Sequence, residues 1–206
     1  MKKLISVSGR AFILPDDNVD TDRIIPARFM KCVTFDGLGE HVFEDDRAQA
    51  KGKHPFDWPE NQGASILIVG ANFGSGSSRE HAVHALTGWG IKAIIGLSFA
   101  GIFRGNATAN GLVCVDVVPA VYFQLIAVLT GEDKPDITVD LLGKSVAAVH
   151  SEGRLDALCT MPEADRQMLT QGTWDTTAVL LEAGDRIEAT ASRLPYLGAS
   201  VEGGAS

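Results

Sequence analysis

The chain is 206 residues long, with 45% hydrophobic residues, 21% charged residues and a formal net charge of −8. This length suffices for one large domain with a substantial core, and the acidic balance argues against binding to nucleic acid or to an anionic membrane. The first apolar run is too short for a secretory signal and no run approaches the ~18 apolar residues of a membrane span, so we expect a cytoplasmic protein.

The N-terminal part predicts a strand, a long irregular segment, a second strand and a helix. Residues 3–14 have the composition of a strand. Residues 15–63 are rich in Asp, Gly, Pro and charge, and a connection of this length without regular structure indicates function or mobility. Residues 64–70 contain four successive apolar side chains, which is typical of a strand buried on both faces. Residues 82–89 carry apolar side chains at helical spacing, which predicts a helix that ends at Gly90.

The middle of the chain repeats this alternation of strands and helices. We expect a strand at 93–95, a helix at about 98–109, a strand at 112–118 and a helix that opens at Pro119. The resulting β-α-β-α-β series implies parallel strands joined by right-handed crossovers, and therefore an α/β fold.

The C-terminal part has a different pattern. Residues 137–141 alternate apolar and polar side chains, which predicts the first strand of a hairpin. Residues 162–195 look helical, with breaks near Gly172 and Gly184. Residues 196–206 are mostly small, and we expect a disordered tail there.

The glycine-rich stretch at 70–82, between a predicted strand and a predicted helix, is the most informative part of the chain. Gly74 and Gly76 allow positive φ and a close approach of the backbone to a ligand. Two hydroxyls and a guanidinium follow at the expected start of the helix, from Ser77, Ser78 and Arg79. Free N–H groups and the helix dipole favour an anion at such a position. The stretch therefore predicts an anion-binding turn.

The spacing of residues in this stretch differs from that of two known phosphate-binding motifs. A Walker A loop requires Lys directly after its last glycine, where Ser77 stands, and a dinucleotide fingerprint requires a third glycine where Arg79 stands. Both nucleotide-binding interpretations are rejected on these grounds. A capping box formed by Ser77 and Glu80 stays open, and in that interpretation Ser77 only begins the helix.

Several motifs together resemble one known family. They are NVDTDRIIP at 18–26, HPFD at 54–57, NFGSGSSREHA at 72–82, SFAGIF at 98–103 and NGL at 110–112. This set looks like the small subunits of 3-isopropylmalate dehydratase, which are the detached swivelling domain of the aconitase superfamily. The resemblance covers about residues 9–118 well and the remainder loosely. It implies a three-layer β/β/α swivelling domain over residues 1–195, of which about 160–195 form a C-terminal helical extension.

The resemblance also implies an activity and a partner. The implied reaction interconverts 2-isopropylmalate and 3-isopropylmalate through an alkene intermediate, in leucine biosynthesis. Dehydration in this superfamily uses a [4Fe–4S] cluster held by three cysteines, whereas Cys32, Cys114 and Cys159 lie far apart and form no such set. We therefore expect this chain to bind no cofactor itself, and to be active on a small dicarboxylic hydroxy acid only together with a cluster-bearing large subunit.

By the same resemblance, two segments carry the site residues. Ser77, the first serine of the Ser-Ser-Arg motif, is implied as the base that removes a proton from carbon. N–H groups, the helix N-terminus and Arg79 would stabilise its alkoxide. The guanidinium of Arg79 suits a substrate carboxylate. Further substrate contacts are implied for Thr21, Gly74, Gly76 and Ser78. Asp22 is implied to position protonation partners from the large subunit, although its segment also suits an ordinary turn.

In relatives, a third stretch lines the variable side chain of the substrate. Here it consists of Arg28, Phe29, Met30 and Lys31. An Arg in this stretch marks tricarboxylate substrates in some archaeal relatives, and apolar residues mark isopropylmalate, so the mixed stretch leaves both open. Residues 27–42 are apolar enough that we expect them to be mobile in the isolated chain and to order against the partner.

Departures from the family pattern keep alternatives open. Ser75 stands where bacterial relatives usually have Cys, and Val113 and Cys114 replace the usual Leu-Pro. A related hydro-lyase acting on citraconate, homoaconitate or dimethylmaleate is one alternative, and a non-catalytic anion-binding domain is another. His81 and His84 have a spacing that some metal sites use, but no third ligand is evident, so we expect no metal site.

Overall fold

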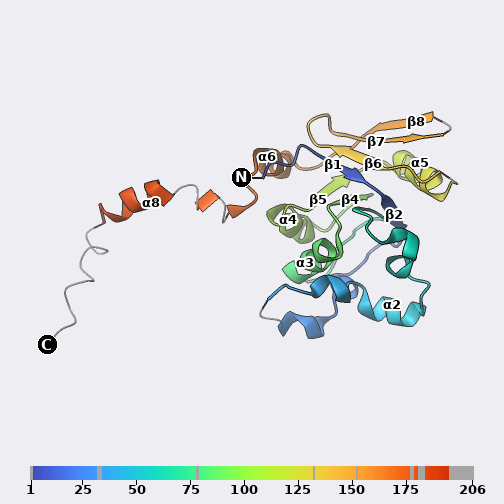
Figure 1. The fold of residues 1–206 in the computed structure, drawn as a ribbon, viewed down its shortest axis with the longest axis horizontal. Helices are drawn as coiled ribbons and strands as arrows, with labels where there is room; N and C mark the ends of the chain where they lie inside the picture. The colour runs from blue at the N-terminus through green and yellow to red at the C-terminus, as the bar shows by residue number, and fades with distance from the viewer. Residues whose placement is uncertain are drawn as a thin grey trace.

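Four short parallel strands lie at the centre of the computed structural model, which describes residues 2–31, 34–77, 79–131, 133–151, 153–176, 179–180 and 184–194. In spatial order they are β2 (Ala11–Leu14), β3 (Ile66–Val69), β4 (Ala93–Gly96) and β5 (Val113–Asp116) (Figure 1). Every residue of β3 and β4 is buried, because packed layers cover both faces of the sheet. The predicted strands are confirmed, with small shifts at their ends.

Two crossover helices cover one face of this sheet. The helices α3 (Glu80–Trp89) and α4 (Gly101–Ala109) join β3 to β4 and β4 to β5, as the β-α-β-α-β prediction requires. The helix α4 begins three residues later than predicted, because residues 98–100 stay extended. There Phe73 N donates to Ser98 O at 3.1 Å and Ala100 N donates to Phe73 O at 3.0 Å.

A second, antiparallel sheet packs with α5 (Pro119–Thr130) on the opposite face of the parallel sheet. Its strands, in order, are β1 (Ser6–Gly9), β6 (Ile137–Asp140), β7 (Ser145–His150) and β8 (Gly153–Leu158). The predicted α/β fold is thus confirmed as a parallel sheet of βαβ units combined with an antiparallel sheet. The predicted hairpin is confirmed as β6 and β7, whereas β8 was not predicted.

The prediction of one strand over residues 3–14 is wrong. The segment divides into β1 and β2, which belong to different sheets. The chain changes sheets at Gly9, where an added Cβ would lie 2.2 Å from Ser65 Oγ. A side chain at this position would force the Ser65 hydroxyl to move, and the apolar pattern of residues 3–14 does not indicate where the strand divides.

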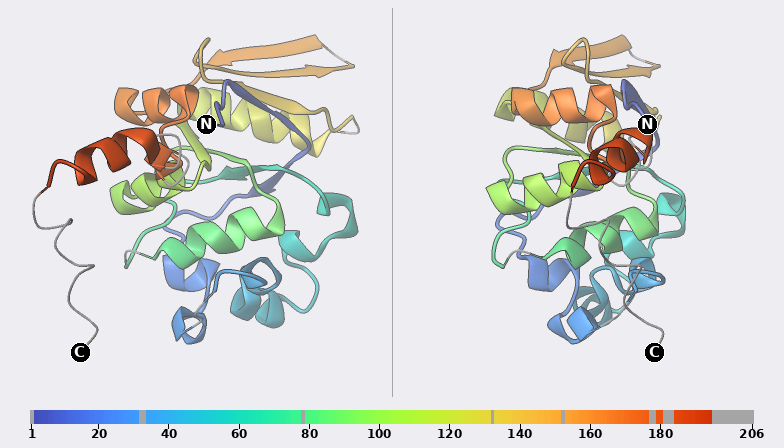
Figure 2. Two further views of the ribbon diagram at one scale, coloured as in Figure 1. Left: turned by 60° about the vertical axis from the view of Figure 1, so that its left-hand side comes forward. Right: turned by 90° about the vertical axis from the view of Figure 1, so that its left-hand side faces the viewer.

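The segment between β2 and β3 is more ordered than predicted. Its described residues form α1 (Thr21–Ile24), α2 (Glu44–Ala50) and four 3₁₀ helices: η1 (Ala27–Lys31), η2 (Leu38–His41), η3 (Pro55–Asp57) and η4 (Pro59–Asn61). In Figures 1 and 2 this blue-to-cyan segment lies at the end of the body opposite the antiparallel sheet. Leu38, Val42 and Phe43 are buried in the core with α3, while Met30 and Phe35 are exposed. The mobility of residues 27–42 stays a prediction. It was based on apolar side chains that would lack packing in the isolated chain, and this is wrong for Leu38, which is buried.

The predicted C-terminal helical extension contains α6 (Glu163–Gln171) and α8 (Gly184–Ala191). The break near Gly172 is confirmed, since this residue ends α6 in a left-handed conformation and its N–H bonds to Met168 O. The N-terminus lies beside α6, where Leu4 N donates to Leu169 O at 3.0 Å (Figures 1 and 2). The expected tail, 196–206, lies outside the described residues. None of the helices within the described ranges has the length and apolar character that a membrane crossing requires.

Candidate active site

The glycine loop leaves the C-terminal end of β3, and both of its predicted glycines are required by close neighbours. Gly74 has φ +75°, and an added Cβ would lie 2.2 Å from Phe103 Cγ. Gly76 has φ +90°, and an added Cβ would lie 2.2 Å from Asp20 Oδ2. The loop therefore packs against α4 on one side and against the segment that precedes α1 on the other.

Backbone hydrogen bonds join the loop to residues 18–21. Gly74 N and Ser75 N both donate to Val19 O, at 2.8 and 3.0 Å, and Thr21 N donates to Ser75 O at 2.9 Å. Two segments that are more than fifty residues apart in sequence thus form one unit. The predicted Asp-Thr-Asp turn and the predicted anion-binding turn are brought together.

Thr21 is almost fully buried, and its hydroxyl donates to the carbonyl of Ser77 at 3.0 Å. Its side chain therefore positions the backbone of Ser77. Ser77 itself is exposed at the surface of the loop. Ser78, the other serine assigned to substrate binding, lies outside the described residues.

Arg79 and Asp22 form an ion pair through Nη1 and Oδ1 at the centre of this unit. The side chain of Arg79 is only 10% exposed, whereas that of Asp22 is 50% exposed. The Nε atom of Arg79 is buried and has no hydrogen-bond partner among the described residues. A nearly buried guanidinium with an unused donor is suited to a further anion.

The capping-box interpretation of Ser77 and Glu80 is wrong. The helix α3 begins at Glu80, and its N-cap is Arg79, which has an extended backbone with φ −126° and makes no capping bond through its side chain. Glu80 instead accepts a hydrogen bond from Asn110 Nδ2 at 3.2 Å and lies 3.4 Å from His84 Nε2. Helix capping therefore does not account for Ser77.

Several residues that support the site were not assigned from the sequence. Asp20 caps α1 by accepting from Asp22 N at 2.7 Å, so it positions the carboxylate that pairs with Arg79. Arg23, next to Asp22, is held by Asp16 at 2.6 Å and by Asp46 at 2.8 Å. The acids and arginines close together near residue 20 could have indicated a network of ion pairs. Which acid pairs with which arginine depends on tertiary folding and could not be predicted from their spacing.

The stretch assigned to substrate specificity lies in η1, and one of its two charged residues, Arg28, is turned toward α2. Arg28 is held there by Glu44 and Asp45, at 2.7 and 2.8 Å. Phe29 is partly buried, and its ring stacks on that of His41 with the centroids 4.1 Å apart. Met30 and Lys31 are exposed.

His81 and His84 lie on α3 and face the aromatic ring of Phe35. The rings of Phe35 and His84 are stacked with their centroids 3.7 Å apart. Within the described ranges, no group of three or more His, Cys, Asp or Glu residues is placed to hold a metal ion. Cys114 and Cys159 are both buried and free.

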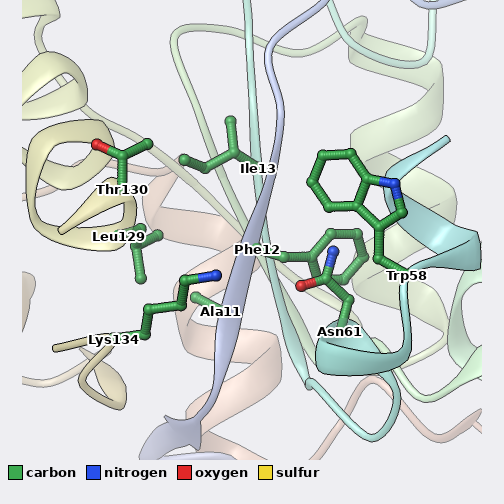
Figure 3. Close-up of a pocket in the computed structure, with 8 residues that line it drawn as sticks. All are labelled: Ala11, Phe12, Ile13, Trp58, Asn61, Leu129, Thr130 and Lys134. Atoms are coloured by element: carbon green, nitrogen blue, oxygen red, sulfur yellow. The ribbon is translucent and has the colours of Figure 1, made fainter. Parts of the chain in front are cut away.

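A separate cavity of about 270 Å³ lies beside β2 (Figure 3). Trp58 and Asn61 line one side of it, and the end of α5 with Lys134 lines the other. It is bordered by Ala11, Phe12 and Ile13, upstream of the end of β2 that leads to the site. The residues of the glycine loop do not line this cavity, so it is separate from the candidate site.

Comparisons with known proteins agree with the motifs of this unit. The family model for the aconitase C-terminal domain matches residues 1–119. The 3-isopropylmalate dehydratase small subunit of Synechocystis sp. is 47% identical over 197 residues, which cover 96% of this chain and 96% of that protein. The protein of the same name from Thermus thermophilus is 43% identical and covers 95% of this chain and 97% of its own length.

The fold of this chain is also similar to that of a solved structure from the same family. The crystal structure of 3-isopropylmalate dehydratase (leuD) from Methanocaldococcus jannaschii aligns with a TM-score of 0.61 and 27% identity. The alignment covers 87% of this chain and 99% of that one.

Proposed function

The chain belongs to the family of 3-isopropylmalate dehydratase small subunits, within the aconitase C-terminal domain family, and from this membership we propose that it supplies half of a composite active site. The proposed reaction is the isomerisation of 2-isopropylmalate and 3-isopropylmalate by dehydration and rehydration, in leucine biosynthesis. The enzyme of this name is a hydro-lyase.

The ion pair between Arg79 and Asp22 is the observation that carries the proposal. A guanidinium that is 10% exposed, and whose buried Nε has no partner in the described part of the chain, is poised for a carboxylate. The partner carboxylate of Asp22 is half exposed, so a substrate carboxylate can take its place at Arg79 Nη1. In that exchange Asp22 is released beside the substrate, where it positions protonation partners.

Ser77 is the proposed base. It lies two residues before Arg79, and Thr21 fixes its backbone by bonding to its carbonyl. In the dehydration direction, the proton on carbon passes to Ser77 Oγ while the carbon–carbon double bond forms and hydroxide leaves. The alkoxide form of Ser77 is stabilised by the guanidinium of Arg79 and by N–H groups at the start of α3. We assign the departure of hydroxide to the other half of the site.

That other half is proposed to lie in a cluster-bearing large subunit. The two described cysteines of this chain, Cys114 and Cys159, are buried, and burial raises the pKa of both thiols, that of Cys159 to about 11. They are unsuited to act as thiolate ligands. The chain is then the swivelling domain of a cytoplasmic heteromer, and it meets the large subunit at the face that carries Arg79 and Ser77.

Reconstitution tests this proposal. The purified chain alone is expected to show no turnover of 2-isopropylmalate and no iron absorbance, and turnover is expected when a family large subunit with its cluster is added. Preference of the assembled enzyme for citraconate, homoaconitate or dimethylmaleate would replace the substrate and keep the reaction class. Turnover or iron absorbance in the isolated chain, or an inactive assembly with every acid, would refute the composite site.

A further inference from the structure

The strand β2 lies at one edge of the parallel sheet, and part of its backbone faces outward. Ile66 N donates to Arg10 O at 3.1 Å, so the alternation of a parallel ladder also directs the N–H and C=O of Phe12 toward β3. The same groups of Ala11 and Ile13 then point away from the sheet. They form no hydrogen bond with any described part of the chain. This edge of the sheet can therefore pair with a further strand.

The cavity of about 270 Å³ lies along this edge (Figure 3). In Figure 3 two groups of side chains flank β2, one on each face of the sheet: Ile13, Leu129, Thr130 and Lys134 on one side, and Phe12, Trp58 and Asn61 on the other. Successive side chains of an added strand would point to these two sides in turn, because side chains alternate along a strand.

Both sides of the cavity are held by hydrogen bonds within the chain. Asn61 Nδ2 donates to Pro55 O at 2.8 Å, and Thr130 Oγ1 donates to Ile126 O at 2.9 Å. The side chain of Trp58, at the start of η4, is 40% exposed and offers an apolar surface. The cavity is thus already formed before anything binds to it.

The charge beside this edge is positive. Lys134 is the one charged residue that lines the cavity, and it forms no ion pair with a described carboxylate. The adjacent Asp133 is turned away, since it accepts from Ser151 N at 2.8 Å. Arg10 directly precedes Ala11, and its guanidinium donates to neutral backbone carbonyls, among them that of Glu60 at 3.1 Å. An acidic side chain would therefore complement this edge.

A second copy of the chain is a poor occupant. Pairing of two β2 edges about a twofold axis would place each cation near its own equivalent, and the chain has a net charge of −8.

We propose that the free edge of β2 binds an extended segment of a partner protein as an added strand. The segment directs an acidic side chain toward Lys134 and the next, apolar side chain toward Trp58. Hydrogen bonds to the backbone of Ala11 and Ile13 supply affinity, and the two side chains supply specificity. The site is separate from the unit of Arg79 and Asp22 and does not depend on the proposed function.

The test uses the purified full chain and the peptide acetyl-TEVEVT-amide, whose acidic and apolar side chains alternate. Amide hydrogen exchange followed by NMR should slow at least ~10-fold for Ala11 and Ile13 when the peptide is bound. Exchange of Phe12, whose N–H already faces β3, should change much less. The peptide acetyl-TEAEAT-amide should bind at least ~10-fold more weakly, because less apolar surface is buried on Trp58.

A charge exchange tests the acidic preference. Lys134→Glu should weaken binding of acetyl-TEVEVT-amide about tenfold, and this variant should bind acetyl-TKVKVT-amide more tightly than the wild type does. Lys92→Glu is the matched control, because it changes the net charge equally but precedes β4, two strands away from β2. It should leave the affinity for acetyl-TEVEVT-amide nearly unchanged.

Three results would overturn the proposal. The first is unchanged exchange of Ala11 and Ile13 at about 1 mM peptide, which is weaker than a useful docking affinity. The second is equal weakening by Lys134→Glu and Lys92→Glu, which would show only an effect of net charge. The third is protection of Ala11 and Ile13 that grows with the concentration of the chain alone, which would show that a second copy occupies the edge.

Discussion

Replacement of Gly76 by Ala tests how the glycine loop positions the acidic turn. The residue has φ +90°, and its added Cβ would lie 2.2 Å from Asp20 Oδ2 and 2.9 Å from Asp20 Oδ1. Asp20 Oδ1 is the atom that caps α1 through Asp22 N. The substitution therefore strains the backbone and displaces a helix cap.

The expected loss of unfolding free energy follows from these two effects. A non-glycine residue with positive φ costs about 1–2 kcal/mol, and loss of an Asp cap costs about 1 kcal/mol. Gly76→Ala should therefore lower the free energy of unfolding by about 2–3 kcal/mol. Gly37→Ala is the control, because Gly37 has φ +80° and nothing lies within 4 Å of its added Cβ. That variant should lose only the backbone part, about 1–2 kcal/mol.

A double-mutant cycle in urea isolates the contact. Asp20→Ala alone should cost about 1 kcal/mol, and it also removes the carboxylate atoms that the methyl group added at position 76 would strike. The double variant should therefore be about 1 kcal/mol more stable than the sum of the single effects predicts. Additive losses, or a Gly76→Ala variant as stable as Gly37→Ala, would show that Gly76 does not position Asp20.

Three further outcomes are expected. Burial lowers the pKa of His54, whose Nδ1 accepts from Phe56 N at 3.3 Å. The neutral imidazole therefore stabilises the folded state fully above the unfolded pKa of about 6.5, and this stabilisation is lost as the pH falls toward the folded pKa. Urea unfolding from about pH 7.5 to 5.5 should show this slope in the wild type and a smaller one in His54→Gln, and equal slopes would contradict it. Gly39→Ala places a Cβ 2.3 Å from the carbonyl carbon of Gly88, so it should lower the free energy of unfolding by at least ~2 kcal/mol, more than Gly37→Ala does. Equal melting temperatures of these two variants would argue against close packing of η2 on α3. Arg79→Lys keeps the charge but loses the planar fork, so KM of the assembled enzyme should rise more than kcat falls, and an unchanged KM would count against Arg79 as the carboxylate ligand.

The parts of the fold that depend on local pattern were predictable. The apolar runs of β3 and β4 and the helical spacing of α3 predict these elements with their ends correct to within a few residues. The division of residues 3–14 into β1 and β2 was not predictable, because it depends on which distant strand each half pairs with. The helices between β2 and β3 were missed because each is too short to show a period.

The same division applies to the candidate site. Gly74, Gly76 and Arg79 stand out in the sequence because glycines and a cation directly before a helix are typical of an anion-binding turn. The capping box failed because Arg79 adopts an extended conformation, which moves the start of α3 past Ser77. The pairing of Arg79 with Asp22 and of Arg28 with Glu44 and Asp45 depends on tertiary folding, and no local spacing marks it.

Ser77→Ala in the enzyme assembled with its large subunit tests the central claim most directly, when kcat and melting temperature are measured on the same sample. Arg79 occupies the N-cap position of α3, so this substitution should leave the melting temperature nearly unchanged. As the loss of a general base, it should lower kcat at least ~100-fold with little change in KM. A kcat close to that of the wild type would contradict the account, because Ser77 would then not be the base of this half of the active site.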